Sequence, residues 1–178
     1  MNKNIILTGF MGSGKTTCGQ LLAQMLNYDF IDIDSYIETN ESDSIIHIFE
    51  EYGEDYFRQL ETNACQNFKN IKCHVISTGG GTVKKSLNMK LLSKNGIVFY
   101  LSASSLKIYN NIKADNNNRP LLNTNNLYET IELLLAERKL LYEKTADYII
   151  ETDMKSPEQI SYEIKRIWEA YIDKNSGY

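Results

Sequence analysis

The chain has 178 residues, of which 42% are hydrophobic and 24% charged, and its formal net charge is −4. These values predict one globular domain over residues 1–178 and argue against nucleic acid as a partner, because no long basic run is present. No apolar run is long enough for a membrane span or a signal peptide, and the three cysteines form no C-x-x-C pair. We therefore expect a cytoplasmic monomer with free thiols that binds no membrane.

A glycine-rich segment near the start gives the strongest local signal. Residues 9–16 read GFMGSGKT, which fits the phosphate-loop pattern G-x-x-x-x-G-K-[ST]. The apolar run 5–7 before it predicts a buried parallel strand, and residues 16–26 after it have apolar positions at helical spacing. In such a unit, backbone N–H groups and the helix N-terminus bind phosphate, Lys15 contacts the β- and γ-phosphates, and Thr16 binds Mg²⁺. The predicted nucleotide-binding residues are Gly12, Ser13, Gly14, Lys15, Thr16 and Thr17.

Two carboxylates end the second predicted strand, residues 28–34. If the strand continues to its last residue, Asp32 and Asp34 lie on the same face at its carboxyl end, where open α/β sheets bind ligands. Such a pair needs a metal, a substrate hydroxyl or water between its charges. The alternative is a solvated turn in which the two acids begin a helix.

Residues 35–70 are predicted to be mostly helical, with Ser44 as a helix cap and Gly53 as an interruption. Arg58 and Glu61 are three residues apart and can therefore touch on one helix face. They are either a surface ion pair of little energetic value, or a pair in which Glu61 orients Arg58 toward a ligand carboxylate. The spacing leaves both interpretations open.

A third strand, residues 74–77, leads into three consecutive glycines, Gly79, Gly80 and Gly81. Such a turn lets the backbone approach a ligand closely and offers N–H donors to hydroxyl or phosphate oxygens. Residues 86–95 predict a helix with Leu87 on its inner side and Gly96 as its C-cap, followed by a fourth strand at 97–101.

Residues 113–126 form an Asn-rich, aperiodic stretch that predicts a lid loop. Arg119 is the cationic residue of its Asn-rich part, residues 115–126. A helix containing Arg138, a strand at 147–151 and a helix beginning at 156–158 complete the pattern. Strands that alternate with helices predict an α/β fold with a five-stranded parallel sheet flanked by helices. The phosphate loop, the Asp pair and the glycine turn would then meet at the carboxyl edge of the sheet.

Together these motifs resemble the shikimate kinase family, in the family's order and over almost the whole chain. They are GFMGSGKTT, Asp32-x-Asp34, Phe57-Arg58-x-x-Glu61, Thr78-Gly79-Gly80-Gly81, Arg119-Pro120-Leu121-Leu122 and Arg138…Tyr142…Ala146-Asp147. The resemblance implies the P-loop, nucleoside-monophosphate-kinase-like fold, with a substrate-binding helical region at about 34–70. It also implies transfer of the ATP γ-phosphate to the 3-hydroxyl of shikimate, in aromatic amino acid biosynthesis.

The resemblance also implies roles for individual residues. Shikimate would be bound by Asp34, Arg58, Gly79, Gly80, Gly81, Arg138, Phe49, Phe57 and Glu61, although phenylalanines are more often core residues. Catalysis would rest on Lys15, Asp34 and Arg119, ATP would also contact Arg119 and Lys155, and Mg²⁺ would be held by Thr16 and Asp32.

One departure from the family pattern concerns adenine. Many members carry an arginine seven residues before the lid arginine, where this chain has Ile112 followed by Lys113. Two other interpretations remain: another small-molecule kinase of this fold, acting on gluconate or a nucleoside monophosphate, and a nucleotide-dependent switch. The switch would need D-x-x-G and N-K-x-D motifs, and neither follows the phosphate loop.

Overall fold

The computed structural model describes residues 3–114 and 126–175. It contains a five-stranded sheet in the order β2-β3-β1-β4-β5, and all four strand pairings are parallel. The strands are β1 (Asn4–Thr8), β2 (Asp29–Asp32), β3 (His74–Ser77), β4 (Gly96–Ser102) and β5 (Tyr148–Glu151). The predicted fold class is therefore confirmed.

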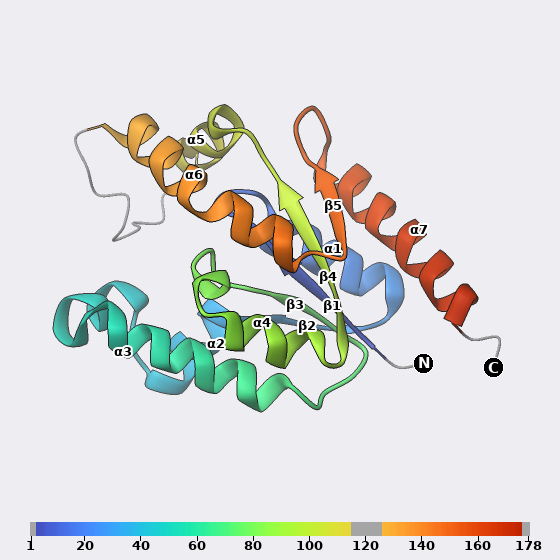
Figure 1. Cartoon of the computed structure of the whole chain (residues 1–178), viewed down its shortest axis with the longest axis horizontal. Coiled ribbons are helices and arrows are strands. Elements are labelled where there is room, and N and C mark those ends of the chain that lie inside the picture. Colours follow the sequence, from blue (N-terminus) through green and yellow to red (C-terminus); the bar gives the residue numbers. More distant parts are fainter. Residues whose placement is uncertain (1–2, 115–125, 176–178) are drawn as a thin grey trace.

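Helices alternate with these strands, as Figure 1 shows. They are α1 (Lys15–Leu26), α2 (Ile33–Glu41), α3 (Ile45–Phe68), α4 (Ser86–Ser93), α5 (Ser105–Ala114), α6 (Leu127–Thr145) and α7 (Pro157–Asn175), with a short 3₁₀ turn, η1 (Thr82–Lys84). Among the described residues, no helix is both long and apolar enough to cross a membrane.

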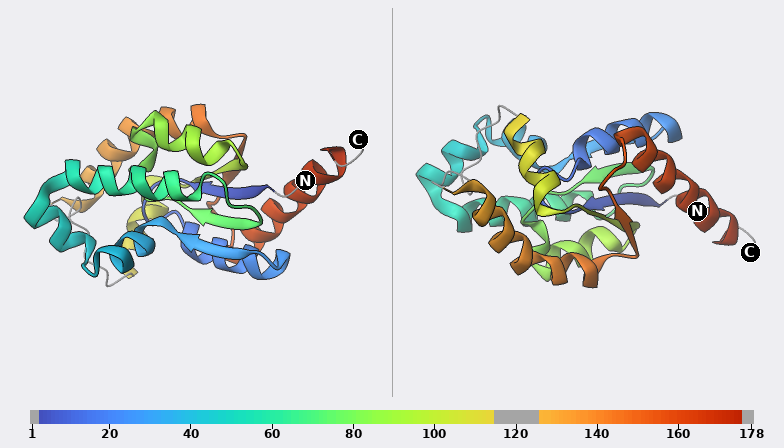
Figure 2. Two further views of the ribbon diagram at one scale, coloured as in Figure 1. Left: turned by 90° about the horizontal axis from the view of Figure 1, so that it is seen from below. Right: turned by 90° about the horizontal axis from the view of Figure 1, so that it is seen from above.

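The sheet separates two hydrophobic clusters, because successive strand side chains point to opposite faces. On β1, Ile5 and Leu7 pack into the cluster under α1 and α7, whereas Ile6 packs into the cluster under α3, α4 and α6. Figure 2 shows these two helical layers on either side of the sheet. α2 and the first half of α3 lie beyond the carboxyl edge of the sheet.

Local sequence signals explain where the helices in this region begin and bend. The Ser44 hydroxyl accepts a hydrogen bond from the backbone N–H of His47 at 3.2 Å and so caps α3, as predicted. Gly53 interrupts α3 with φ 81° and ψ 171°, a backbone conformation that L side chains rarely adopt. The chain therefore bends at Gly53 just before the segment that carries Arg58.

Three details of the sequence prediction were wrong. β2 ends at Asp32, and Asp34 lies in the first turn of α2, so the two carboxylates do not share a strand face and instead begin a helix, as the alternative interpretation had it. Gly96 is the first residue of β4 and does not cap α4. Glycine is needed there because a Cβ would come within 2.7 Å of Ile6 Cγ1. Leu87 is 53% exposed, because α4 buries Met89 and Leu92 instead.

The predicted lid lies mainly outside the described residues. Lys113 and Ala114 belong to the end of α5, and Asn126 caps α6 through a hydrogen bond from the N–H of Glu129. Residues 115–125, including the predicted catalytic residue Arg119, are not among those that the structure describes.

Candidate active site

The phosphate loop lies between β1 and α1, at the carboxyl edge of the sheet. Gly12 and Gly14 have φ values of +80° and +92°, which explains why glycine occupies both positions. The Lys15 ammonium donates hydrogen bonds of 3.0 Å to the carbonyl oxygens of both Gly9 and Phe10. Its charge is thus held directly over the loop. Ser13 is buried, while Thr16 and Thr17 are exposed in the first turn of α1.

Asp32 lies beside the phosphate loop. One carboxylate oxygen accepts a 2.8 Å hydrogen bond from the Thr16 hydroxyl. The other accepts from the N–H groups of Asp34 and Ser35 at 3.1 and 3.3 Å, so Asp32 is also the cap of α2. These contacts place a carboxylate and a hydroxyl together at a phosphate-binding site. In the described part of the chain no cluster of three His, Cys, Asp or Glu side chains forms a metal cage.

Asp34 projects from α2 toward the glycine turn. A Cβ built on Gly79 would lie 2.5 Å from Asp34 Oδ1 and 2.8 Å from Glu61 Oε1, so glycine is required for these carboxylates to approach the turn. Asp34 Oδ1 is buried and has no hydrogen-bond partner among the described residues. Burial, reinforced by the charges of Asp32 and Glu61, raises the pKa of Asp34 to about 7, while Lys15 and Arg58 act in the opposite direction.

Arg58 is held from two sides by carboxylates. Its Nη1 donates to Glu61 at 2.5 Å, and its Nε and Nη2 donate to one oxygen of Glu54 at 3.0 and 2.8 Å. Glu61 is fully buried and also accepts a 2.6 Å hydrogen bond from the Thr82 hydroxyl. Burial opposes the charge of Arg58, but the two carboxylates raise its pKa above the ordinary value. The surface-pair interpretation is therefore wrong, and Glu61 orients Arg58.

Arg138 comes from α6 and faces the same turn. The residue is 1% exposed, its Nη1 donates a long 3.4 Å hydrogen bond to the Gly80 carbonyl, and its Cζ lies 5.6 Å from the centre of the Phe10 ring. Its Nε has no hydrogen-bond partner among the described residues. A buried cation with an unused donor is suited to bind an anionic ligand group.

The predicted aromatic residues also lie near Arg58. The rings of Phe49 and Phe57 are 4.9 Å apart, and the Arg58 guanidinium lies 5.3 Å from the Phe57 ring. Phe57 is buried in the core and Phe49 packs against it. Both residues therefore belong to the hydrophobic core as well as to the surroundings of the site.

Two residues bear on the predicted adenine contacts: Lys155, which was expected on the adenine side, and Ile112, where the chain departs from the family pattern. Lys155 follows β5 and forms a 2.6 Å ion pair with Glu163 of α7. Ile112 is buried, and a Cβ on Gly12 would lie 3.0 Å from its Cγ1. Ile112 thus packs beneath the phosphate loop as a core residue.

Sequence reasoning assigned no role to the residues that hold the site in place, although the family motif includes Tyr142. Glu54 and Thr82 fix the Arg58–Glu61 pair, and Tyr142 donates a 2.5 Å hydrogen bond to the Gly80 carbonyl. The spacing of Glu54 and Arg58, four residues apart on one helix, is a signal that could have identified Glu54. Thr82 and Tyr142 meet their partners only through the tertiary fold.

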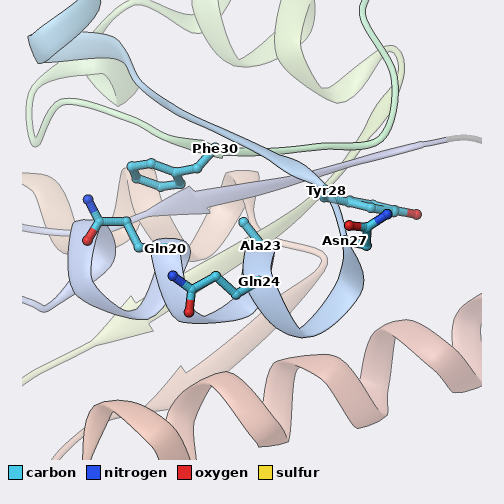
Figure 3. Close-up of a pocket in the computed structure, with 6 residues that line it drawn as sticks. All are labelled: Gln20, Ala23, Gln24, Asn27, Tyr28 and Phe30. Atoms are coloured by element: carbon cyan, nitrogen blue, oxygen red, sulfur yellow. The ribbon is translucent and has the colours of Figure 1, made fainter.

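A separate pocket of about 470 Å³ lies on α1 and the start of β2. Its lining residues, drawn in Figure 3, are uncharged: Gln20, Ala23, Gln24, Asn27, Tyr28 and Phe30. None of them belongs to the phosphate loop, the glycine turn or the arginine pair.

A phosphate loop with a lysine over it, a neighbouring carboxylate–threonine pair and a parallel α/β sheet define the class of P-loop nucleotide-binding proteins, to which the P-loop kinases belong. Comparison with known proteins identifies the family. The family model described as shikimate kinase matches residues 11–169. The chain belongs to the shikimate kinase family, and is accordingly an ATP-dependent kinase, as the sequence motifs predicted.

Individual relatives agree. A shikimate kinase of Thermodesulfovibrio yellowstonii is 43% identical over 167 residues, which cover 94% of this chain and 95% of the relative. The structure of an Acinetobacter baumannii shikimate kinase in complex with shikimate has a TM-score of 0.91 and 35% identity, covering 96% of this chain and 95% of that one. An Aquifex aeolicus shikimate kinase has a TM-score of 0.78 and 33% identity, with coverages of 94% and 97%.

Proposed function

We propose that the chain transfers the γ-phosphate of ATP to the 3-hydroxyl of shikimate, giving shikimate 3-phosphate and ADP. One observation carries this proposal: two buried arginines and a carboxylate surround the glycine turn beside the phosphate loop. Shikimate has a carboxylate and ring hydroxyls, so Arg58 and Arg138 would bind its carboxylate and Asp34 would accept the proton or hydrogen bond of the reacting hydroxyl.

The nucleotide side of the site would be formed by the loop residues 12–17. Phosphoryl transfer depends on positioning and charge neutralisation, and Lys15 lies where it can supply positive charge to the γ-phosphate. Mg²⁺ commonly takes one or two protein oxygen ligands together with substrate phosphates, and Thr16 and Asp32 fit that requirement. When bound, Mg²⁺ would neutralise phosphate charge. Arg119 would add a further cation, and Lys155 would lie on the adenine side.

The acceptor side would combine charge with shape. Gly79, Gly80 and Gly81 would offer backbone N–H groups to the hydroxyls, and Phe49 and Phe57 would line an apolar wall. Glu61 would act by orienting Arg58, since its own oxygens are already engaged by Arg58 and Thr82. Lid closure over residues 113–126 would exclude water and limit wasteful hydrolysis of ATP.

The test is a coupled ADP-release assay with shikimate, its methyl ester and gluconate as separate acceptors. We expect shikimate-dependent turnover and very slow turnover with the ester, because the ester cannot pair with the two arginines although its 3-hydroxyl is intact. Equal rates for the acid and the ester would contradict the arginine clamp. Turnover with gluconate in place of shikimate would instead favour a sugar-acid kinase.

We also propose that the protein is a cytoplasmic monomer that does not bind nucleic acid. The net charge of −4 and the absence of a long basic run support the last point. Sedimentation at several protein concentrations would test the monomer, and a concentration-dependent rise in mass would contradict it.

A further inference from the structure

The hydroxyl of Tyr142 makes a buried contact that the proposed reaction does not yet use. Tyr142 is fully buried on α6, and its ring stacks on that of Tyr100 from β4 with centroids 5.0 Å apart and an interplanar angle of 20°. Its hydroxyl donates a 2.5 Å hydrogen bond to the carbonyl oxygen of Gly80. The stacked ring fixes the hydroxyl, so the carbonyl is bound by a rigid group.

Gly80 is confined from the other side by the phosphate loop. A Cβ built on Gly80 would lie 3.0 Å from the backbone nitrogen of Met11 and 3.7 Å from the carbonyl oxygen of Gly9. The same carbonyl that Tyr142 binds also accepts the 3.4 Å hydrogen bond from Arg138. Gly80 therefore lies between the phosphate loop and the two α6 side chains.

The Gly80 carbonyl determines how the turn presents its N–H groups. Because a trans peptide is planar, its carbonyl oxygen and the N–H of the next residue point in opposite directions. A hydroxyl that fixes the Gly80 carbonyl thus also fixes the direction of the Gly81 N–H. Without that hydroxyl the carbonyl keeps, among contacts of the described residues, the longer one from Arg138, and the glycines add no side chains to restrain the turn.

We propose that Tyr142 is a positioning residue for acceptor binding: its hydroxyl orients the Gly80–Gly81 peptide and holds the glycine turn against the phosphate loop. The proposal rests on the proposed function only for the identity of the acceptor. Tyr142 acts through Gly80 and Arg138 and does not itself contact the reacting atoms.

The kinetic test uses Tyr142→Phe, which keeps the ring and removes only the hydroxyl. Tyr100→Phe is the matched control, because Tyr100 belongs to the same ring stack and the substitution likewise removes one hydroxyl from it. We expect Tyr142→Phe to raise KM for shikimate about tenfold, the loss expected for one buried hydrogen bond, with little change in ATP affinity. Tyr100→Phe should leave KM for shikimate unchanged. The proposal would be overturned if both substitutions raised KM for shikimate equally, or if Tyr142→Phe left KM for shikimate unchanged.

A second measurement does not depend on the acceptor. In protein labelled with ¹⁵N-glycine and free of substrate, Tyr142→Phe should shift the Gly81 amide resonance, because that N–H shares a peptide with the Gly80 carbonyl. Tyr100→Phe should leave the resonance in place. An unshifted Gly81 signal would overturn the positioning role. A shifted signal without shikimate-dependent turnover in the wild type would instead contradict the proposed function and leave the role of Tyr142 supported.

Discussion

The guanidinium of Arg58 lies directly against the α-carbon of Gly81: a Cβ on Gly81 would come within 2.5 Å of Arg58 Nη2 and 2.6 Å of its Cζ. Gly81 is thus the residue whose lack of a side chain allows Arg58 to reach the turn.

Gly81→Ala should therefore displace the Arg58 guanidinium from its position between Glu54 and Glu61. We expect KM for shikimate to rise at least about tenfold, because a small displacement of a positioning group has a large effect on binding and rate. Affinity for an ATP analogue, measured by calorimetry, should stay within about twofold of the wild-type value, since binding at the phosphate loop is separate from the Arg58 contact. An unchanged KM would show that Arg58 does not bind the acceptor from this position.

The two arginines should differ in how much their replacement by methionine destabilises the protein. Arg58→Met removes the partner of the fully buried Glu61 and should destabilise the protein by about 3–5 kcal/mol. Arg138→Met removes a buried cation that pairs with no carboxylate in the ion pairs of the described residues and whose Nε has no partner there, so its loss of stability should be clearly smaller. Both variants should lose shikimate turnover. Urea unfolding of the two variants measures the difference, and a similar loss of stability in both would contradict this account.

Lys15→Ala should reduce kcat on the order of a thousandfold, since the γ-phosphate loses a fixed cation. The Lys15 ammonium donates to the Gly9 and Phe10 carbonyls of its own loop, so its loss is a local change that should leave the sheet and the helices in place. Initial rates at saturating ATP and shikimate, together with a circular dichroism spectrum, provide the measurement. A folded variant with a near-normal rate would disprove the phosphate-loop assignment.

Asp34→Asn should nearly abolish transfer while ATP still binds. An amide is a poor base and cannot replace a carboxylate facing the reacting hydroxyl. The substitution also removes one of three neighbouring negative charges, those of Asp32, Asp34 and Glu61, so the variant should be at least as stable as the wild type. If calorimetry instead found that ATP binding was lost, Asp34 would have a role in nucleotide or metal binding.

Glu54 should contribute stability that depends on pH. Burial opposes its charge, but the hydrogen bonds from Arg58 hold the pKa of Glu54 below its usual value. This contribution is therefore present above the ordinary carboxyl range and is lost as the pH falls through the lowered pKa. Because the side chain is 39% exposed, Glu54→Gln should cost less than about 1 kcal/mol at neutral pH. The difference in unfolding free energy between the wild type and Glu54→Gln, measured by urea unfolding, should shrink as the pH falls. A difference that grows on acidification would contradict a stabilising role for the Glu54 carboxylate.

The sequence predicts the sheet and the site motifs because these depend on local patterns. Buried runs such as residues 5–7 and 97–101 mark parallel strands, and glycine turns mark strand ends. For Asp34, local patterns offered both a strand and the start of a helix, and the structure has the second. The backbone changes from strand to helix at Ile33, because Asp32 caps α2, and a period-two pattern cannot register that change.

The contacts that fix the site were even harder to predict from the sequence. The hydroxyl of Thr82 reaches Glu61 and that of Tyr142 reaches Gly80, across sequence separations of 21 and 62 residues. Such pairs are set by how α3 and α6 pack around the turn. Gly96 shows the same limit, since its lack of a side chain reflects contact with Ile6 of a neighbouring strand rather than helix termination.

The location of the single tryptophan has a spectroscopic consequence. Trp168 is 2% exposed, lies in the cluster under α1 and α7, and contacts Tyr28 and Tyr171. The sheet separates this cluster from the one that surrounds Arg58 and Arg138. Its intrinsic fluorescence should therefore report global unfolding and respond weakly when substrates bind. A fluorescence titration of acceptor binding would therefore need a tryptophan at another position, for example in the variant Tyr52→Trp. Tyr52 is 57% exposed and lies on α3 just before the bend at Gly53.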